Sequence, residues 1–208
     1  MPVLQGVYTV LMTTTLQPPT PAHVRTAWPR LLTAADLARP PTSLPGGDVR
    51  YELADGILVI HSPPTGVCGR SQALALSHLH SAEARGVGKL LGRAGVILRR
   101  NPDRVVGPAV SLIGRDQWPP KVSPEDFLET IPKLVVEIRS KNDTLPEIES
   151  KIAEYLAAGV VEVWVLDPED QTVAKHHAEG VQILTPDQSL TSDLLLGFNV
   201  SVALFFAD

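Results

Sequence analysis

The chain has almost no cysteine. Cys68 is the only cysteine among 208 residues, so no disulfide can form within the chain. This usage is typical of proteins in a reducing compartment, and we expect a cytoplasmic protein. No His-Asp arrangement lies near Cys68 in the sequence to activate it as a thiolate nucleophile.

The chain also lacks an excess of positive charge. Its formal net charge is −5, which provides no overall attraction to nucleic acid. Binding to DNA would therefore depend on a local basic patch. The candidates are Arg99, Arg100 and Arg104 around an Asn-Pro turn, and Arg70 at the head of a predicted helix. Such charges more often belong to a solvated loop than to a binding surface.

Long apolar runs are missing as well. The apolar stretch within residues 1–12 is too short and broken to span a membrane, and it lacks the charged start of a signal peptide. We expect no membrane association. Residues 1–32 are rich in Thr and Pro without sustained periodicity, which predicts a flexible N-terminal arm. The folded domain is predicted over residues 33–208, beginning with a short helix from Ala34 to about Ala38 that Thr33 caps.

Internal repeats and a phosphate-binding glycine loop are absent too. What remains is an ordinary composition for one globular domain, with 44% apolar and 20% charged residues. At the start of the predicted domain, Asp55-Gly56 between two apolar runs indicates a type I′ hairpin turn.

The most informative segment is residues 134–168, which reads as strand, loop, helix and strand. In the first strand, alternation places Leu134, Val136 and Ile138 on one face and Val135, Glu137 and Arg139 on the other. Glu137 is a carboxylate in a strand apolar enough to be buried. Such a charge needs an ionic partner or a metal.

The helix that follows has a clear start signal. Thr144 occupies the cap position, Pro146 the first turn, and Glu147 the position three residues after the cap. Lys151 lies at the edge of the apolar stripe of this helix, so its stem can pack on the core while its ammonium reaches the sheet. An acid from a strand and a lysine from the next helix are the parts of a magnesium-dependent phosphodiesterase site. They are equally the parts of a buried ion pair.

These residues resemble the Uma-type endonuclease family, long known as a domain of unknown function, within the PD-(D/E)XK restriction-endonuclease-like superfamily. The resemblance rests on YELADGILVIHSPPTG (51–66), LVVEIRS (134–140), KIAEYLAAGVVEVWVLDPEDQTV (151–173) and LLLGFNVSVALFF (194–206). It covers roughly residues 33–206 in one collinear register. It implies an α/β restriction-endonuclease-like fold, with a central mixed β-sheet flanked by helices and an additional N-terminal β-hairpin.

The resemblance also implies a set of site residues. The family's strand glutamate corresponds to Glu137, its helix lysine to Lys151, and the glutamate of its first hairpin to Glu52. The family's metal-binding aspartate, in a Pro-Asp-Val, is replaced by Ala109, and a histidine found in the family is replaced by Cys68. The catalytic candidates are therefore Glu52, Glu137 and Lys151, and the metal positions are Glu137 and Ala109.

The loss at position 109 bears on metal binding. Mg²⁺ or Mn²⁺ is held by oxygen ligands, often one or two carboxylates with water and phosphate oxygens, and Ala109 removes the second carboxylate. Cys68 cannot compensate, because thiolates favour softer metals. We expect a weak metal site. Even the substitution of a residue that only hydrogen-bonds a metal ligand typically lowers metal affinity or activity about 10–100-fold.

Three side chains have competing interpretations. Arg139 could clamp a substrate phosphate, or it could pair with Glu137 and fill the vacated metal site. Lys151 could instead pair with Glu147 one helical turn away. Glu52 could be an ordinary exposed strand residue. The family resemblance favours the site role for Glu52 and Lys151.

Two functions therefore remain open. The first is a Mg²⁺- or Mn²⁺-dependent DNA endonuclease with a weakened site. The second is a pseudo-nuclease that keeps the fold as a non-catalytic nucleic-acid-binding or dimerisation module. A homodimer is expected by analogy with restriction-like nucleases.

Overall fold

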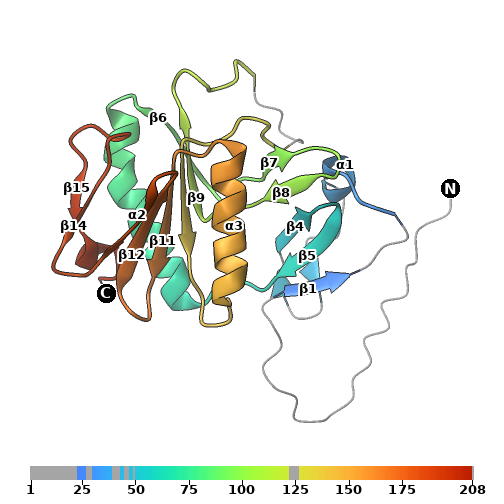
Figure 1. Ribbon diagram of the computed structural model, residues 1–208, viewed down its shortest axis with the longest axis horizontal. Coiled ribbons are helices and arrows are strands. Elements are labelled where there is room, and N and C mark those ends of the chain that lie inside the picture. Colours follow the sequence, from blue (N-terminus) through green and yellow to red (C-terminus); the bar gives the residue numbers. More distant parts are fainter. Residues whose placement is uncertain are drawn as a thin grey trace, which may run out of the picture.

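The computed structural model describes residues 23–26, 30–38, 43–44, 47–48, 50–121 and 127–207 (Figure 1). Most of the predicted N-terminal arm lies outside these residues, and that prediction stays untested. Within the arm, β1 (His23–Thr26) pairs antiparallel with β5 (Ile57–His61). The helix predicted after the arm is present as α1 (Ala34–Leu37), with Thr33 and Asp36 forming a capping box.

The first of two large sheets is antiparallel and has the strand order β1-β5-β4-β8-β7. Its remaining strands are β4 (Arg50–Ala54), β8 (Arg104–Val106) and β7 (Val96–Arg99). The β4–β5 hairpin turns at Asp55 and Gly56, which both have positive φ, 55° and 74°. This is the backbone that a type I′ turn requires, so the predicted N-terminal hairpin is confirmed.

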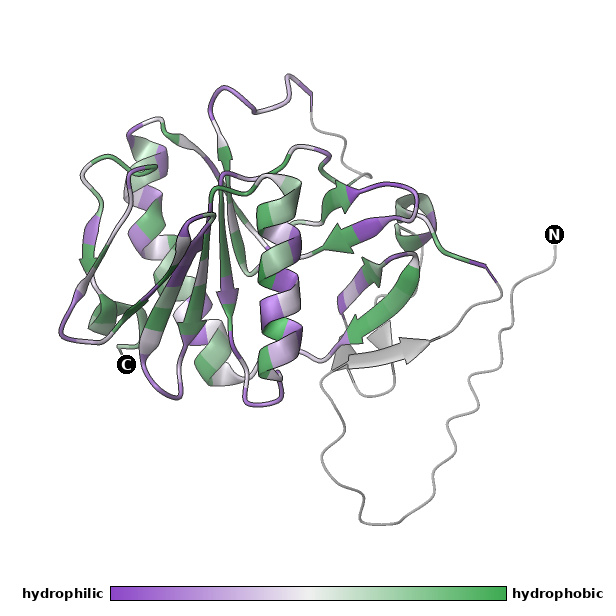
Figure 2. Cartoon of the chain, viewed as in Figure 1, coloured by the Kyte–Doolittle hydropathy of each residue, from purple (hydrophilic) through white to green (hydrophobic). Residues whose placement is uncertain are grey.

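The second sheet is the central mixed sheet predicted from the resemblance, with the order β13-β12-β11-β10-β9-β6. Only β10 and β11 are parallel to each other, and α3 (Leu145–Ala158) connects them. The strands are β6 (Gly88–Gly92), β9 (Val110–Gly114), β10 (Leu134–Ile138), β11 (Glu162–Asp167), β12 (Thr172–His177) and β13 (Gly180–Leu184). Apolar residues concentrate in the central strands β9, β10 and β11 (Figure 2).

Two helices cover opposite faces of the mixed sheet (Figure 1). Leu134 and Val136 pack with residues of α2 (Gly66–Ala84), whereas Val135 packs with Ile152 and Tyr155 of α3. The alternation predicted for this strand is therefore the observed one, and it directs position 137 toward α3.

Helix α2 begins four residues before its predicted start. Thr65 is the N-cap, and its hydroxyl oxygen accepts a hydrogen bond from the Cys68 amide at 3.4 Å. Helix α3 begins as predicted, with the Thr144 amide donating to Glu147 Oε2 at 3.1 Å. Gly159, in the left-handed conformation, ends it.

Three smaller elements complete the described chain. A β14–β15 pair (Ser189–Thr191 and Asn199–Ser201) precedes the 3₁₀ helix η1 (Val202–Phe205), and β2 (Ser43–Leu44) pairs with β3 (Gly47–Asp48). Within the described part of the chain, no helix has the length and apolar character needed to cross a bilayer.

Candidate active site

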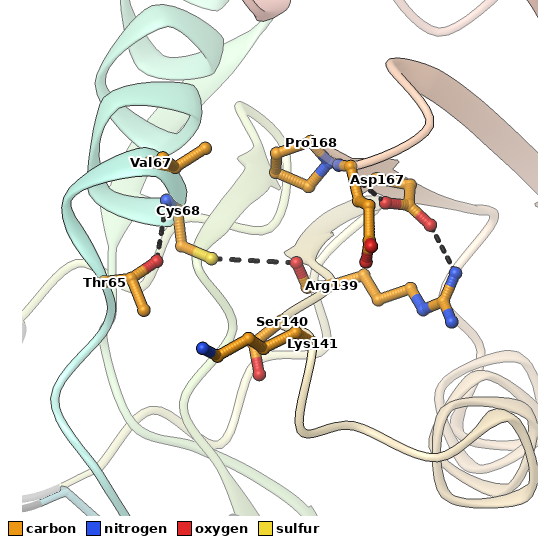
Figure 3. Close-up of a pocket in the computed structure, with 9 residues that line it drawn as sticks. Thr65, Val67, Cys68, Arg139, Ser140, Lys141, Asp167 and Pro168 are labelled. Carbon is orange, nitrogen blue, oxygen red and sulfur yellow. Dashed lines mark hydrogen bonds and ion pairs between the residues drawn. The ribbon is translucent and has the colours of Figure 1, made fainter.

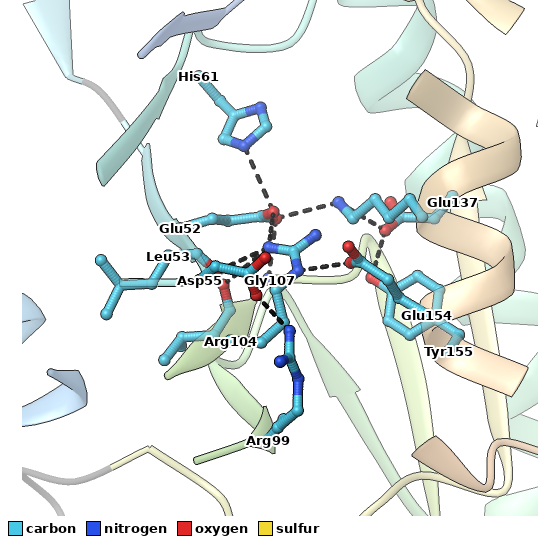
Figure 4. A network of polar contacts seen from close by, with 12 residues as sticks. Glu52, Leu53, Asp55, His61, Arg99, Arg104, Gly107, Glu137, Glu154 and Tyr155 are labelled. Atoms are coloured by element: carbon cyan, nitrogen blue, oxygen red, sulfur yellow. Dashed lines mark hydrogen bonds and ion pairs between the residues drawn. The ribbon is translucent and has the colours of Figure 1, made fainter. Parts of the chain in front are cut away.

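Glu52 is the buried centre of a polar network at the junction of the two sheets (Figure 4). Strand β4 carries it, and only 5% of its side chain is exposed. Its Oε1 accepts hydrogen bonds from the Gly107 amide and from Lys151 Nζ, both at 3.0 Å. Its Oε2 lies 3.4 Å from His61 Nε2 and 3.6 Å from Arg104 Nη1. Both carboxylate oxygens are therefore in contact with polar partners.

These partners keep Glu52 ionised. Burial by itself raises the pKa of this carboxyl, but the ammonium of Lys151, the contact with His61 and the guanidinium of Arg104 together hold the pKa well below its ordinary value. A carboxylate so deep in the protein is stable only because these charges surround it.

Glu137 reaches the same lysine from the other sheet. Its Oε1 lies 2.9 Å from Lys151 Nζ and accepts a 2.6 Å hydrogen bond from the Tyr155 hydroxyl. Lys151 and Tyr155 are four residues apart on α3, so they face the sheet from the same side of the helix. The Glu137 side chain is 21% exposed, which is more open than Glu52.

Lys151 joins the two carboxylates. Burial lowers its pKa, but the charges of Glu137 and Glu52 outweigh this effect, and the pKa lies above its ordinary value. The ammonium is therefore charged at neutral pH. The pKa of Tyr155 is raised well above its ordinary value by burial and by the same two carboxylates. The phenol therefore stays protonated and donates a hydrogen bond to Glu137.

The structure thus brings together the three residues that the resemblance implied, from β4, β10 and α3. The competing interpretations of two of them are not the observed arrangement. Glu52 is buried rather than exposed on its strand, and Lys151 contacts Glu52 and Glu137 while Glu147 caps the helix.

Sequence reasoning missed the role of Arg104. The sequence places Arg104 in a candidate surface basic patch, but only 8% of its side chain is exposed. Its Nε lies 2.5 Å from Glu154 Oε2, and its Nη1 donates to the Leu53 carbonyl at 2.8 Å as well as approaching Glu52. One signal for this role was available. Lys151 and Glu154 are three residues apart on α3, so both side chains extend toward the first sheet, where Glu154 needs a basic partner.

The other arginines of the predicted basic patch are also engaged. Arg99 pairs with Asp55, Arg100 pairs with Asp103 and Glu129, and Arg70 donates to the Ala207 carbonyl at 3.2 Å. Acidic partners neutralise the first two. This loop therefore presents little net positive charge.

Ala109 directly precedes β9, the strand next to the one that carries Glu137. The β9–β10 register ends with Val110 opposite Val136, so Ala109 and Glu137 both adjoin this last pair. A carboxylate at position 109 would therefore lie near Glu137. Ala109 is buried and contributes no side-chain oxygen there.

The residues present do not fit a complete site for Mg²⁺ or Mn²⁺. Among the residues that the structure describes, no three His, Cys, Asp or Glu side chains come together as a metal site. Glu52 is enclosed by its partners, whereas Glu137 uses only its Oε1 for contacts with the described residues. Divalent ions of this kind are usually held by one or two carboxylates, so this chain is at the lower limit.

Cys68 and Arg139 line a separate pocket of about 450 Å³ (Figure 3). The pocket lies between the start of α2 and the carboxyl ends of β10 and β11. Cys68 Sγ lies 3.6 Å from the Arg139 carbonyl oxygen. The Arg139 guanidinium forms an ion pair with Asp167, at the end of β11, and not with Glu137. The interpretation in which Arg139 fills the vacated metal site is therefore not the observed arrangement.

Comparisons with known proteins agree with this fold. The family model Uma2, described as "Putative restriction endonuclease", matches residues 40–203. A crystal structure described as "a putative nuclease belonging to DUF820", from Anabaena variabilis ATCC 29413, is similar to the chain with a TM-score of 0.69 and 17% identity. The match covers 84% of this chain and 97% of that chain, and at this identity it shows the fold alone. No curated protein matches the chain.

Proposed function

The chain belongs to the Uma2 family of restriction-endonuclease-like proteins, and on this premise we propose that it is a metal-dependent DNA endonuclease weakened at position 109. The observation that carries the proposal is the convergence of Glu52 and Glu137, from two different sheets, on the ammonium of Lys151 at 3.0 and 2.9 Å. The proposed reaction is hydrolysis of a phosphodiester bond.

Lys151 is the proposed contact to the scissile phosphate or to the attacking water. A lysine ammonium has three N–H donors, and the two glutamates use two of them. With 22% of its side chain exposed, Lys151 can offer the third to a phosphate oxygen. A fixed positive charge at that point stabilises the negative charge that develops on the phosphate during hydrolysis.

The two glutamates have different proposed roles. Glu52 positions Lys151, because its oxygens are already taken by the Gly107 amide, His61 and Arg104. Glu137, oriented by the Tyr155 hydroxyl, is the carboxylate left for Mg²⁺ or Mn²⁺. Such an ion, when bound, neutralises phosphate charge and lowers the pKa of water. Arg139 keeps its proposed role as a contact to a substrate phosphate at the edge of the neighbouring pocket.

Plasmid cleavage with Mg²⁺ and with Mn²⁺ tests this proposal, using the unmodified chain, Glu137→Ala and Ala109→Asp. Cleavage that Glu137→Ala abolishes would establish an enzyme working with an incomplete metal site. Cleavage seen only with Ala109→Asp would mean that one residue switches off an intact scaffold. Silence from all three proteins would contradict the endonuclease proposal.

A second candidate function is a non-catalytic nucleic-acid-binding or dimerisation module. The missing carboxylate at Ala109 favours it, and so does Lys151, whose ammonium contacts both glutamates. A surface for dimerisation is available on β13, an edge strand on which Val181 and Ile183 are 54% and 65% exposed. We propose a homodimer in either case. Sedimentation equilibrium checks it, and a monomer at all accessible concentrations would contradict it.

A further inference from the structure

Two partly buried arginines near the candidate site have no counter-charge among the residues that the structure describes. The described chain has four arginines that are at least partly buried, and two of them, Arg104 and Arg139, form ion pairs with carboxylates. The other two are Arg50, at the start of β4, and Arg93, directly after β6. Neither has an ion-pair partner among the described residues, and the Nε of Arg50 is buried without a hydrogen bond.

Arg93 is held firmly in place. Its Nε donates to Gln72 Oε1 at 2.8 Å, and Gln72 Nε2 in turn donates to the Ala109 carbonyl at 2.8 Å. The Arg93 amide donates to the same carbonyl at 3.3 Å. Only the Nε of the guanidinium is used in this way. Its two terminal nitrogens remain available to a ligand.

The sheet register places Arg93 beside the altered metal position. The β6–β9 register pairs Gly92 with Val110, so the next antiparallel step sets Arg93 opposite Ala109. Val110 is in turn paired with Val136, which precedes Glu137 on β10. Arg93 and Glu137 therefore both lie near position 109, with the Arg93 side chain bonded to Gln72 of α2 and the Glu137 side chain in contact with Lys151 and Tyr155 of α3.

The surroundings of Arg93 are electrostatically unfavourable for a cation. Burial lowers the pKa of Arg93, and the charge of Arg50 lowers it further, while Glu137 and Cys68 act in the opposite direction. Arg93 also has a φ of 51°, which is uncommon for a residue other than glycine. Backbone in such a conformation persists where the surrounding structure enforces it, and it is frequent at ligand sites.

We propose that Arg50 and Arg93 together bind a phosphate group of a nucleic-acid strand whose neighbouring phosphodiester lies at Glu137 and Lys151. An arginine guanidinium is planar and matches phosphate oxygens in bidentate fashion. Two guanidiniums from different sheets, with no ion-pair partner in the described part of the chain, form a site that an incoming phosphate neutralises. The proposal rests on the proposed function, because that function supplies the strand.

The test measures DNA binding without catalysis. A short fluorescein-labelled duplex is titrated in EDTA at several salt concentrations with the unmodified chain, Arg50→Gln, Arg93→Gln and Arg93→Lys. Arg115→Gln is the matched control, because Arg115 is exposed and follows the opposite end of β9. Thermal melting of each variant checks that the fold is intact.

The expected result is a change in salt dependence. Each of Arg50→Gln and Arg93→Gln should reduce the slope of log K against log salt by about 1 and weaken binding to every duplex sequence by a similar factor. Arg93→Lys and Arg115→Gln should keep the original slope. Equal slopes for all five proteins would overturn the proposal.

Two further outcomes separate this site from the endonuclease itself. DNA binding that depends on Arg50 and Arg93, together with no cleavage under any metal, would support the phosphate site and contradict the endonuclease. The protein could instead fail to bind DNA but show a chemical-shift response to inorganic pyrophosphate that Arg93→Gln removes. This result would overturn the proposal that the phosphate belongs to a nucleic acid, and would assign the site to a small phosphate compound.

Discussion

The two sides of the candidate site differ in how completely their charges are matched. Around Glu52, the carboxylate contacts Lys151, His61, Arg104 and the Gly107 amide, so this closed side has its charges matched. On the open side, Arg93 after β6 and Arg50 at the start of β4 have no ion-pair partner among the described residues, and Ala109 supplies no carboxylate. The closed side is suited to stability, and the open side is the one proposed to bind a charged ligand.

The largest expected effect is the loss of stability when Glu52, on the closed side, is removed. Glu52→Ala should lower the free energy of unfolding by about 3–5 kcal/mol, because it removes the counter-charge shared by Lys151 and Arg104. Glu137→Ala, at the more exposed end, should lower it by only about 1–2 kcal/mol. Urea unfolding of both variants measures the difference. Equal losses would mean that the two carboxylates are equivalent supports of the fold.

Removing the shared charge tests the function of the closed side. Lys151→Met keeps the packed stem and should reduce DNA cleavage by roughly 100-fold, if cleavage is detected, because a preorganised charge facing the phosphate is lost. The control is Lys133→Met, since Lys133 pairs with Asp116 beyond the opposite end of β10. A Lys151→Met protein that is folded and fully active would refute the proposed contact to phosphate.

An aspartate at position 109 should change the open side of the site. Ala109→Asp should raise Mn²⁺ affinity by roughly 10–100-fold, by analogy with the size of other changes around metal ligands. In EDTA the same variant should weaken DNA binding, because the new carboxylate lies next to Arg93. Calorimetric titration with Mn²⁺ measures the first effect, and fluorescence anisotropy measures the second. Unchanged Mn²⁺ affinity would place the metal, if there is one, elsewhere.

The stability that Glu52 contributes on the closed side should depend on pH. The pKa of Glu52 is lower in the folded protein than in the unfolded chain, so its contribution to stability is present above the unfolded pKa, about 4.3. That contribution is lost as the pH falls through the folded value. The free energy of unfolding should therefore decline more steeply with acid in the unmodified chain than in Glu52→Gln. Parallel declines would show that Glu52 carries no such linkage.

The smallest effect is expected at Arg93. Arg93→Gln should change the free energy of unfolding by less than about 0.5 kcal/mol, or stabilise the fold slightly, because it removes a like charge near Arg50 rather than an ion pair. Thermal melting in low salt measures it. A loss as large as that of Glu52→Ala would mean that Arg93 serves the fold and not a ligand.

Much of the architecture could be predicted because its signals are local. The Asp55-Gly56 turn, the alternation around Glu137 and the cap at Thr144 each lie within a few residues of the element they specify. The start of α2 was placed too late, because the cap at Thr65 is followed by glycine and valine rather than by a clear helical pattern. Glu52, Glu137 and Lys151 came from the family resemblance, which supplies long-range information that a single pattern lacks.

The rest of the site depends on contacts between distant segments. Arg104 lies next to charged residues in the sequence, yet its partners are 50 and more residues away, so nothing local indicates burial. Tyr155 has an aromatic ring that fits the apolar stripe of its helix, and only the fold shows its hydroxyl at Glu137. Arg93 has no local signal at all, because its significance lies in which charges are absent around it.

Lys151 also fastens the two sheets to each other, since one of its glutamates belongs to each. A descendant that loses nuclease activity would still unfold more easily without this lysine, so natural selection would retain the residue for stability alone. Surveys of related sequences that use the lysine as a mark of activity would then count inactive members as enzymes. Under the proposed function, the residue at position 109, where the fold does not need an acid, is the better diagnostic of which members keep nuclease activity.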